Sequence, residues 1–262
     1  MNIDEESTFW AERSHAELAE LVAELHRQRN IAHKASLEKQ VFIARKSYAD
    51  IFIYGKGVEL GAGSRPWPIP AEASCHYGDV LDEEELKTYH GSTDVVSGAR
   101  LNAQTMEGIP RDSLDFVISA HVLEHLHDPL GALTRQLECL KRGGILLFAV
   151  PDKRHTWDKD RPVTSLKHFE ADFLDGGAST LLDAYVEHLT YVHPLLAGVT
   201  LSPQQISEQA RAAMEQLQDI HFHTWTTETL GMMLQRLGRI QLVRLYGPRL
   251  NVNENIAVIR KL

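Results

Sequence analysis

A glycine turn and an abundance of histidine are the features of this chain that indicate chemistry. Residues 54–60 are apolar enough to form a short buried strand, and Gly61 and Gly63 then allow a tight turn where no Cβ would fit. Glu59 precedes the first glycine by two residues, so its carboxylate can accept a hydrogen bond from an ammonium or hydroxyl group. Pro66 stands where a dinucleotide fingerprint has its third glycine, which argues against an NAD site.

The spacing of the histidines raises two possibilities, a general base and a metal site. His121 and His125 are four residues apart and can share one face of a helix. The H-E-x-x-H arrangement of zinc proteases is absent, so we expect no metal ion at this pair. His221 and His223 would alternate onto one face of an extended segment, where they contact a substrate or pack in the core.

Strands and helices alternate in the sequence from residue 54 to residue 150, which predicts a doubly wound, mostly parallel α/β sheet. The expected strands are residues 54–60, 74–77, 94–97, 114–119 and 145–150. A helix should start at Asp128 and Pro129, a good N-cap and first residue, and continue to Leu140 before Gly143 and Gly144 stop it. Ligands of such sheets bind beyond the carboxyl ends of the strands. Asp79, about 20 residues past the glycines, is placed to hold ribose hydroxyls there.

The regions on either side of this sheet are predicted to be mainly helical. Residues 1–50 should form a flank with one helix from Ser14 to Asn30 and another from Ser36 to about Tyr48. Residues 51–262 form the main domain, with residues 152–220 as a helical lid or substrate insertion. Further helices are expected after the capping residues Ser202 and Thr226. Residues 240–246 and 255–260 read as the last two strands.

Composition limits the possible partners. The chain has 262 residues and a formal net charge of -9, which argues against nucleic acid as the main partner. Its two cysteines form no disulfide or metal pattern, and residues 1–6 are acidic and lack the apolar region of a signal peptide. Its longest apolar run, residues 145–150, is too short to cross a bilayer. We expect a cytoplasmic protein with a small-molecule partner and no membrane contact, and a homo-oligomer is possible.

Two stretches of this sequence resemble a known family. The Glu59-x-Gly61-x-Gly63 turn resembles motif I of the class I methyltransferases that use S-adenosylmethionine. Residues 113–119, Ser-Leu-Asp-Phe-Val-Ile-Ser, with residues 121–126, His-Val-Leu-Glu-His-Leu, resemble motif IV and the segment after it. The resemblance implies a Rossmann-like sheet of seven strands closed by an antiparallel hairpin, with S-adenosylmethionine as the cofactor.

The resemblance also implies a set of site residues. Asn102 stands where many members have an aspartate that meets the adenine amino group, and its amide oxygen can still accept that hydrogen bond without charge assistance. The implied cofactor-binding residues are Glu59, Gly61, Ala62, Gly63, Asp79, Asn102, Ala103, Ser119, Ala120 and His121. The candidates for a catalytic base are His168, His121 and His223, with Asp152 and Asp160 as secondary candidates.

The acceptor is indicated less directly. Residues 151–169 are polar, follow a strand, and resemble a segment of bacterial methyltransferases associated with surface-polysaccharide synthesis. This favours methyl transfer to a small molecule such as a sugar or another hydroxyl compound. Two alternatives stay open: a catalytically silent member that binds the cofactor as a regulatory subunit, and a metal-assisted methyltransferase that uses the clustered histidines.

Overall fold

The computed structural model describes residues 15–248 and 253–262. The chain divides into two compact units, Met1–Ala44 and Arg45–Leu262. One helix, α2 (His15–Phe52), contributes to both units. The expectation of two separate helices was therefore wrong. Residues 31–35 contain neither glycine nor proline, so nothing in them ends a helix. Ser14 and residues 1–6 lie outside the described residues.

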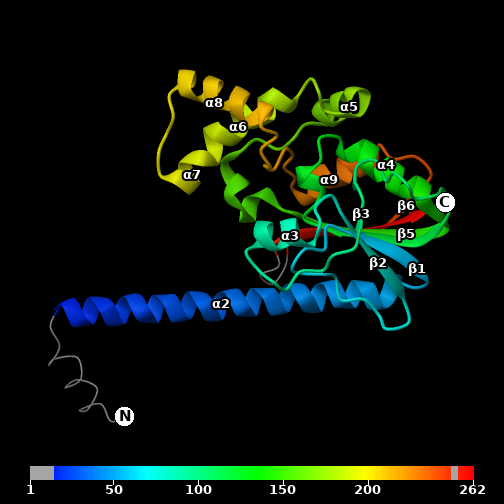
Figure 1. The fold of residues 1–262 in the computed structure, drawn as a ribbon, viewed down its shortest axis with the longest axis horizontal. Coiled ribbons are helices and arrows are strands. Elements are labelled where there is room, and N and C mark those ends of the chain that lie inside the picture. The colour runs from blue at the N-terminus through cyan, green and yellow to red at the C-terminus, as the bar shows by residue number, and fades with distance from the viewer. Residues whose placement is uncertain (1–14, 249–252) are drawn as a thin grey trace, which may run out of the picture. The chain divides into compact units, whose positions relative to one another are not determined.

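The second unit contains a sheet with the seven-stranded, Rossmann-like architecture that we expected (Figure 1). Its strands follow the order β3-β2-β1-β4-β5-β7-β6, in which β7 pairs antiparallel with both β5 and β6 and the other pairs are parallel. The strands are β1 (Lys56–Leu60), β2 (Ser74–Asp79), β3 (Ala99–Arg100), β4 (Leu114–Ala120), β5 (Leu140–Pro151), β6 (Ile240–Tyr246) and β7 (Glu254–Lys261). Part of the turn between β6 and β7, residues 249–252, lies outside the described residues.

Two boundaries differ from the sequence expectation. Residues 94–97 form no strand, because the Val96 amide donates to the Gly63 carbonyl at 2.8 Å and so closes the glycine turn. The third strand is β3 instead, which pairs with the last two residues of β2. Helix α4 (Pro129–Cys139) ends before Leu140, which opens β5 and pairs with Leu114 of β4. Pairing in the sheet thus overrides the leucine periodicity that extended this helix in the prediction.

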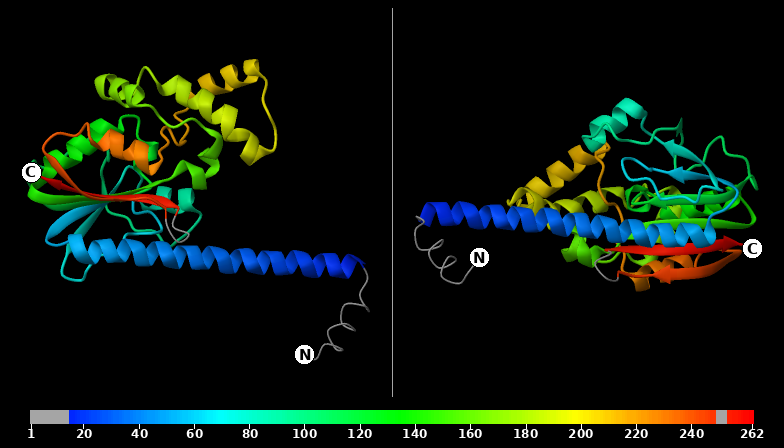
Figure 2. Two further views of the ribbon diagram at one scale, coloured as in Figure 1. Left: turned by 180° about the vertical axis from the view of Figure 1, so that it is seen from behind. Right: turned by 90° about the horizontal axis from the view of Figure 1, so that it is seen from below.

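The main core lies between the sheet and three helices on one side of it, α4, α5 (Leu166–Asp175) and α9 (Thr227–Leu234) (Figures 1 and 2). The Asp128 carboxylate accepts from the Gly131 amide at the start of α4, and Thr226 caps α9, both as expected. Phe169 and Trp225 stack with ring centroids 6.0 Å apart in this core. The segment around Trp225 is thereby tied to α5.

The polar segment and the region after it fold into short turns and helices beyond the carboxyl ends of the parallel strands (Figure 1). They are η2 (Lys153–His155), η3 (Trp157–Asp160), α5, α6 (Leu181–Tyr191), α7 (His193–Ala197) and α8 (Pro203–Glu215). Ser202 and Gln205 form the expected capping box of α8. Helices α6 and α8 share a small core that includes Tyr185 and Phe222. The lid role of residues 152–220, like the domain boundary at residue 50, stays a prediction.

A buried chain of charges joins four elements of this unit. Glu254, the first residue of β7, is buried and receives two hydrogen bonds from Arg45, at 3.1 and 2.7 Å. His121, directly after β4, contacts the same carboxylate through Nε2 at 3.0 Å. The Trp67 indole N–H donates to the Arg45 carbonyl at 2.7 Å, and its ring lies 5.2 Å from the guanidinium carbon. The end of α2 is thus linked to β7 and to the loops after β1 and β4.

This pairing controls the ionisation of Glu254. Burial alone would raise its pKa, but the hydrogen bonds and charges of His121 and Arg45 outweigh burial and lower the pKa to about 2. A carboxyl whose pKa falls on folding stabilises the fold above its ordinary pKa, and this contribution is lost as the pH falls through the folded value.

No helix among residues 15–248 and 253–262 is long and apolar enough to cross a membrane.

We predict that Glu254→Gln lowers the free energy of unfolding by about 3 kcal/mol at pH 7, because it leaves the buried Arg45 guanidinium without its anion. The difference from the wild type should shrink as the pH falls from about 4.5 towards 2, as measured by urea denaturation. Asp50→Asn is the matched control, since its ion pair with Lys46 is exposed and should be worth less than about 0.5 kcal/mol. Equal losses in the two variants would contradict the prediction.

Candidate functional site

A cavity of about 650 Å³ lies at the carboxyl ends of β1, β2 and β4. One part of its wall comes from these strand ends and from α3 (Glu83–His90), and another comes from the segment after α8. Its size suits a small-molecule ligand. The lining residues are Gly61, Gly78, Asp79, Val80, Leu81, Leu86, Tyr89, His90, Leu101, Asn102, Ala103, Gln104, His121, Val122, His125, Leu126, His127, Leu217, Gln218, Asp219 and Phe222.

The glycine turn brings bare backbone to the cavity. Gly61 has a φ of +64°, and a Cβ there would lie 2.5 Å from a methyl group of Val122. Its amide donates to the Gly78 carbonyl at 2.9 Å, which joins the turn to the end of β2. A side chain at this position would force the turn and the neighbouring loop apart. Ala62 and Gly63 complete the turn but do not line the cavity.

Glu59 lies beneath the turn, outside the cavity lining. Its Oε1 accepts from the Trp67 amide at 2.8 Å, and its Oε2 has no hydrogen-bond partner among the described residues. Burial raises the pKa of Glu59 to about 7, although the Trp67 amide and the Arg45 charge oppose this rise. The structure therefore gives Glu59 a clear part in holding the loop after the turn.

Asp79 and Asn102 lie on the cavity wall at the ends of β2 and β3. Asp79 accepts from the Leu81 amide through Oδ1 at 3.0 Å, and its Oδ2 makes no hydrogen bond with the described residues. The Asn102 Oδ1 accepts from the amides of Gln104 and Thr105, at 2.8 and 3.3 Å. Asp79 keeps an oxygen for a ligand, whereas the amide oxygen of Asn102 already holds its own turn.

Of the three cofactor residues predicted at the end of β4, His121 is the one that lines the cavity. Ser119 is buried and, like Ala120, is not part of the lining. His121 has a φ of +56°, held by a hydrogen bond from its amide to the Ala149 carbonyl and by Glu254. Burial disfavours the charged ring, but Glu124, 3.2 Å away, and Glu254 raise its pKa to about 9. This imidazole is therefore a cation at neutral pH.

A hydrogen-bonded chain of three residues on the cavity wall joins α3, the turn after β4 and the segment after α8. His125 contacts Asp219 through Nδ1 at 2.7 Å, and Asp219 accepts from the Tyr89 hydroxyl at 2.6 Å. Burial and the nearby Asp219 raise the pKa of Tyr89 to about 12, so the hydroxyl keeps its proton. Sequence reasoning missed Tyr89 and Asp219, because no motif or spacing relates them to His125.

Arg161 holds the segment that carries Asp219. The side chain of Arg161 is fully buried. It donates to the carbonyls of His221 and Phe222, at 2.7 and 3.2 Å, and to Asp158 and Glu187, at 2.8 and 3.0 Å. Asp158 in turn contacts His221 through Nδ1 at 2.6 Å. Through Arg161, the polar segment after β5 thus holds this part of the wall in place. We call these four hydrogen bonds of Arg161 the Arg161 clamp.

The other predicted base candidates lie outside the cavity lining. His223 is buried and contacts Asp172 through Nε2 at 2.9 Å, and His168 approaches the same carboxylate at 3.4 Å. Asp152 is buried in a bidentate pair with Arg154. Asp160, at the end of η3, is also not part of the lining. The structure brings neither His168 nor His223 to His121.

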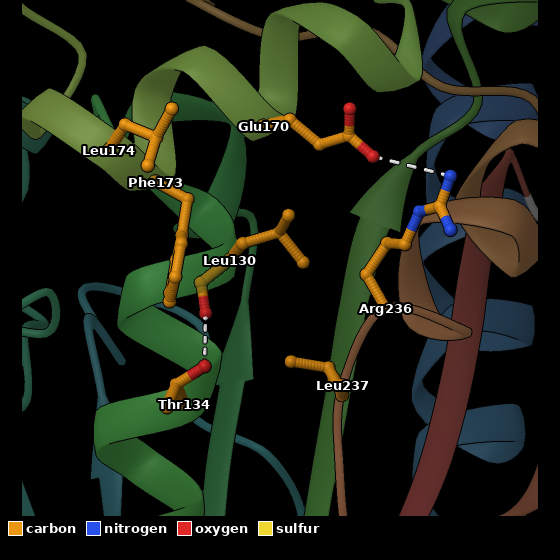
Figure 3. Close-up of a pocket in the computed structure, with 7 residues that line it drawn as sticks. All are labelled: Leu130, Thr134, Glu170, Phe173, Leu174, Arg236 and Leu237. Carbon is orange, nitrogen blue, oxygen red and sulfur yellow. Dashed lines mark hydrogen bonds and ion pairs between the residues drawn. The ribbon is translucent and has the colours of Figure 1, made fainter.

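A smaller hollow of about 250 Å³ lies between α4, α5 and the end of α9 (Figure 3). Its wall is mostly apolar, and an ion pair of 3.2 Å between Glu170 and Arg236 closes one side. The other lining residues are Leu130, Thr134, Phe173, Leu174 and Leu237. Its two charged groups pair with each other, and none of the predicted site residues lines it, so the larger cavity is the candidate site.

Comparison with known proteins adds a family match. Residues 10–238 match the model of a family described as a methyltransferase domain. No curated protein sequence matches the chain. Among solved structures, a Rhodobacter sphaeroides protein described as a zinc-dependent alcohol dehydrogenase is 15% identical over 81% of this chain and 86% of that one, with a TM-score of 0.48.

Two other solved structures are described as methyltransferases. A SAM-dependent methyltransferase from Thermotoga maritima is 12% identical, over 89% of this chain and 95% of that one, with a TM-score of 0.47. The N-methyltransferase NodS from Bradyrhizobium japonicum, solved with S-adenosyl-L-homocysteine, is 12% identical over 86% of this chain and 87% of that one, with a TM-score of 0.46. These likenesses are distant and carry no inference about substrate or site residues.

We predict that Arg161→Met loosens the wall that carries Asp219. The change removes four hydrogen bonds and leaves Asp158 buried without its cation, so the free energy of unfolding should fall by about 3 kcal/mol or more. Hydrogen–deuterium exchange at residues 217–223 should become faster. Arg236→Met is the control, because its half-exposed pair with Glu170 should contribute less than about 1 kcal/mol. If hydrogen–deuterium exchange at residues 217–223 is unchanged in Arg161→Met, Arg161 does not hold this segment in place.

Proposed function

Because the chain belongs to the methyltransferase-domain family, we propose that it transfers the methyl group of S-adenosylmethionine to a hydroxyl group of a small molecule bound in the large cavity. Membership of this family confirms the resemblance seen in the glycine turn and in the motifs around β4. The observation that carries the proposal is a single cavity with the glycine turn and Asp79 on its wall together with His125 and Asp219.

The cofactor is proposed to occupy the end of the cavity formed by the strand ends. Gly61 offers bare backbone for close approach, and the free carboxylate oxygen of Asp79 can accept from ribose hydroxyls. Asn102 and Ala103 lie on the same wall, where an adenine ring would fit beside β3. Glu59 supports this end indirectly, through the Trp67 amide.

The acceptor is proposed to lie against the wall formed by α3 and the segment after α8. Tyr89, His125 and Asp219 present hydrogen-bonding groups there, and Phe222 adds an aromatic surface. Such a mixture suits a polar molecule with hydroxyl groups. Residues 152–220 would then serve as the lid and substrate insertion of a methyltransferase domain that spans residues 51–262.

Methyl transfer from a sulfonium is an in-line displacement, so correct placement of the two reactants supplies much of the rate. His121 is the predicted base candidate that lines the cavity, and its two carboxylate partners fix its ring at the end of β4. Although burial disfavours the charged ring, these partners raise its pKa to about 9, so we propose that His121 acts as a cation that orients the reactants and not as the base. For His168 and His223 we propose a structural role, because both contact Asp172 away from the cavity. They would hold α5 against the segment that precedes α9.

We predict that the protein binds S-adenosylmethionine and S-adenosylhomocysteine and shows no measurable affinity for NAD. Pro66 in place of a third glycine and the shape of the turn give the physical reason. Isothermal titration calorimetry with the three compounds provides the measurement. Transfer of a labelled methyl group to small hydroxyl compounds then tests catalysis. Binding of NAD with no response to either adenosyl compound would refute the proposed function.

We predict that Asp79→Ala weakens binding of S-adenosylhomocysteine by about 2 kcal/mol, or about 30-fold in Kd, because charge-assisted hydrogen bonds to ribose are lost. Asp94→Ala is the matched control, since Asp94 is an exposed aspartate outside the cavity lining. The melting temperatures of both variants should stay close to that of the wild type. Equal affinities in the two variants would place the ribose contact elsewhere.

A further inference from the structure

Three side chains converge beside the cavity in an arrangement that the proposed methyl transfer does not use. Glu124 and His125 belong to η1 (Leu123–His125), the turn after β4, and His221 lies on the segment after α8. Each offers one possible ligand atom, and these atoms all lie within 4.8 Å of one another. The spacing of His121 and His125 gave no sign of this set, because the second imidazole comes from the far end of the insertion.

Glu124 is the first reason to regard these residues as a binding site. Its side chain is fully buried, and neither carboxylate oxygen has a hydrogen-bond partner among the described residues. The nearest cation is His121, whose Nδ1 lies 3.2 Å from Oε1 without the geometry of a hydrogen bond. A buried anion is costly unless its lone pairs are used, so this carboxylate lacks at least one partner.

The orientation of the two imidazoles is the second reason. His125 and His221 each contact a carboxylate through Nδ1, at 2.7 Å to Asp219 and 2.6 Å to Asp158. A proton on Nδ1 leaves Nε2 with a lone pair, and neither Nε2 makes a hydrogen bond with the described residues. Metal-binding histidines are held in this way by carboxylates of an outer layer. The rings lie edge to face with centroids 4.9 Å apart, so both approach the same volume.

The outer layer of this cluster is itself supported. Asp158 is paired with the buried Arg161 at 2.8 Å, and Asp219 accepts from the Tyr89 hydroxyl at 2.6 Å. These contacts fix the carboxylates and therefore the planes of both imidazoles. The backbone also joins the two parts of the cluster, since the Phe222 amide donates to the Glu124 carbonyl at 2.7 Å.

A second cluster in the same unit, formed by His168, Asp172 and His223, differs from the first because its carboxylate already has partners. The carboxylate of Asp172 is already used by His223 at 2.9 Å, by His168 at 3.4 Å and by the Thr180 hydroxyl. Both oxygens of Asp172 therefore already have partners, although Nδ1 of His223 has none among the described residues, so this cluster has no carboxylate oxygen left for a cation. Glu124, by contrast, has two.

We propose that Glu124, His125 and His221 bind a divalent transition-metal ion such as Zn²⁺, Mn²⁺ or Co²⁺ beside the cavity. Two neutral imidazoles and one carboxylate are a common ligand set for such ions and leave coordination positions open. His125 lines the cavity, so an open position can meet the oxygen of an acceptor hydroxyl and lower its pKa, which favours transfer of its proton to solvent water. The oxygen can then bond to the methyl carbon as the carbon–sulfur bond breaks and S-adenosylhomocysteine leaves. This catalytic role rests on the proposed function, whereas binding of the ion does not.

The test uses the full-length protein without a histidine tag, stripped with a chelator and titrated with Co²⁺. The wild type should bind one ion per chain, seen by calorimetry and by visible absorption, and its melting temperature should rise. Glu124→Gln and His221→Ala should each weaken binding at least tenfold, because each removes a ligand. His168→Ala is the matched control and should bind as the wild type does, since it alters the closed cluster.

Binding of S-adenosylhomocysteine by the stripped protein separates this inference from the proposed function. Cofactor binding without any response to Co²⁺, Zn²⁺ or Mn²⁺ would overturn the metal site and leave the methyltransferase proposal intact. Metal binding of wild-type strength in both Glu124→Gln and His221→Ala would also overturn the site. If either variant fails to fold, as judged by circular dichroism, His125→Ala takes its place with the same expected loss.

Discussion

The pairing of Glu254 with Arg45 and His121 is the interaction on which the arrangement of the second unit depends. A carboxylate at the buried start of β7 can be tolerated only with cations beside it, and these come from the end of α2 and the loop after β4. Through Trp67 the same network reaches Glu59, under the glycine turn. One network of contacts therefore joins the end of α2, the start of β7 and the loops after β1 and β4.

Features set by neighbouring residues could be read from the sequence. Apolar runs marked β1, β4 and β5, and the caps Asp128, Ser202 and Thr226 marked helix starts, because caps and periodicity act over a few residues. The errors arose where a distant pairing decided the outcome. Residues 94–97 close the glycine turn through Val96, and Leu140 leaves its helix to pair in the sheet. Neither contact leaves a local pattern.

In the candidate site, too, local sequence patterns identified some residues, and distant contacts decided the rest. Asp79 was predicted because it follows a strand whose end must lie at the ligand-binding edge of the sheet, and His121 was predicted from the family resemblance; both line the cavity. His168 was predicted from its place at the end of the polar segment after β5, yet in the structure it contacts Asp172 outside the cavity lining. Asp219 could not be predicted as a site residue from the sequence. Its contact with His125 depends on the position of a distant segment, to which Arg161 donates hydrogen bonds.

The contacts that Arg161 makes with the segment after α8 affect how the cavity wall can vary between related proteins. The end of the cavity that we propose for the cofactor is made from strand ends, whereas another part of the wall comes from the segment after α8, to which Arg161 donates two hydrogen bonds. Substitutions that alter the contacts of Arg161 with this segment would change that part of the wall and leave the strand pairing of the sheet intact. If the acceptor binds there, as we propose, acceptor preference can change while the strand ends that we propose for the cofactor stay the same.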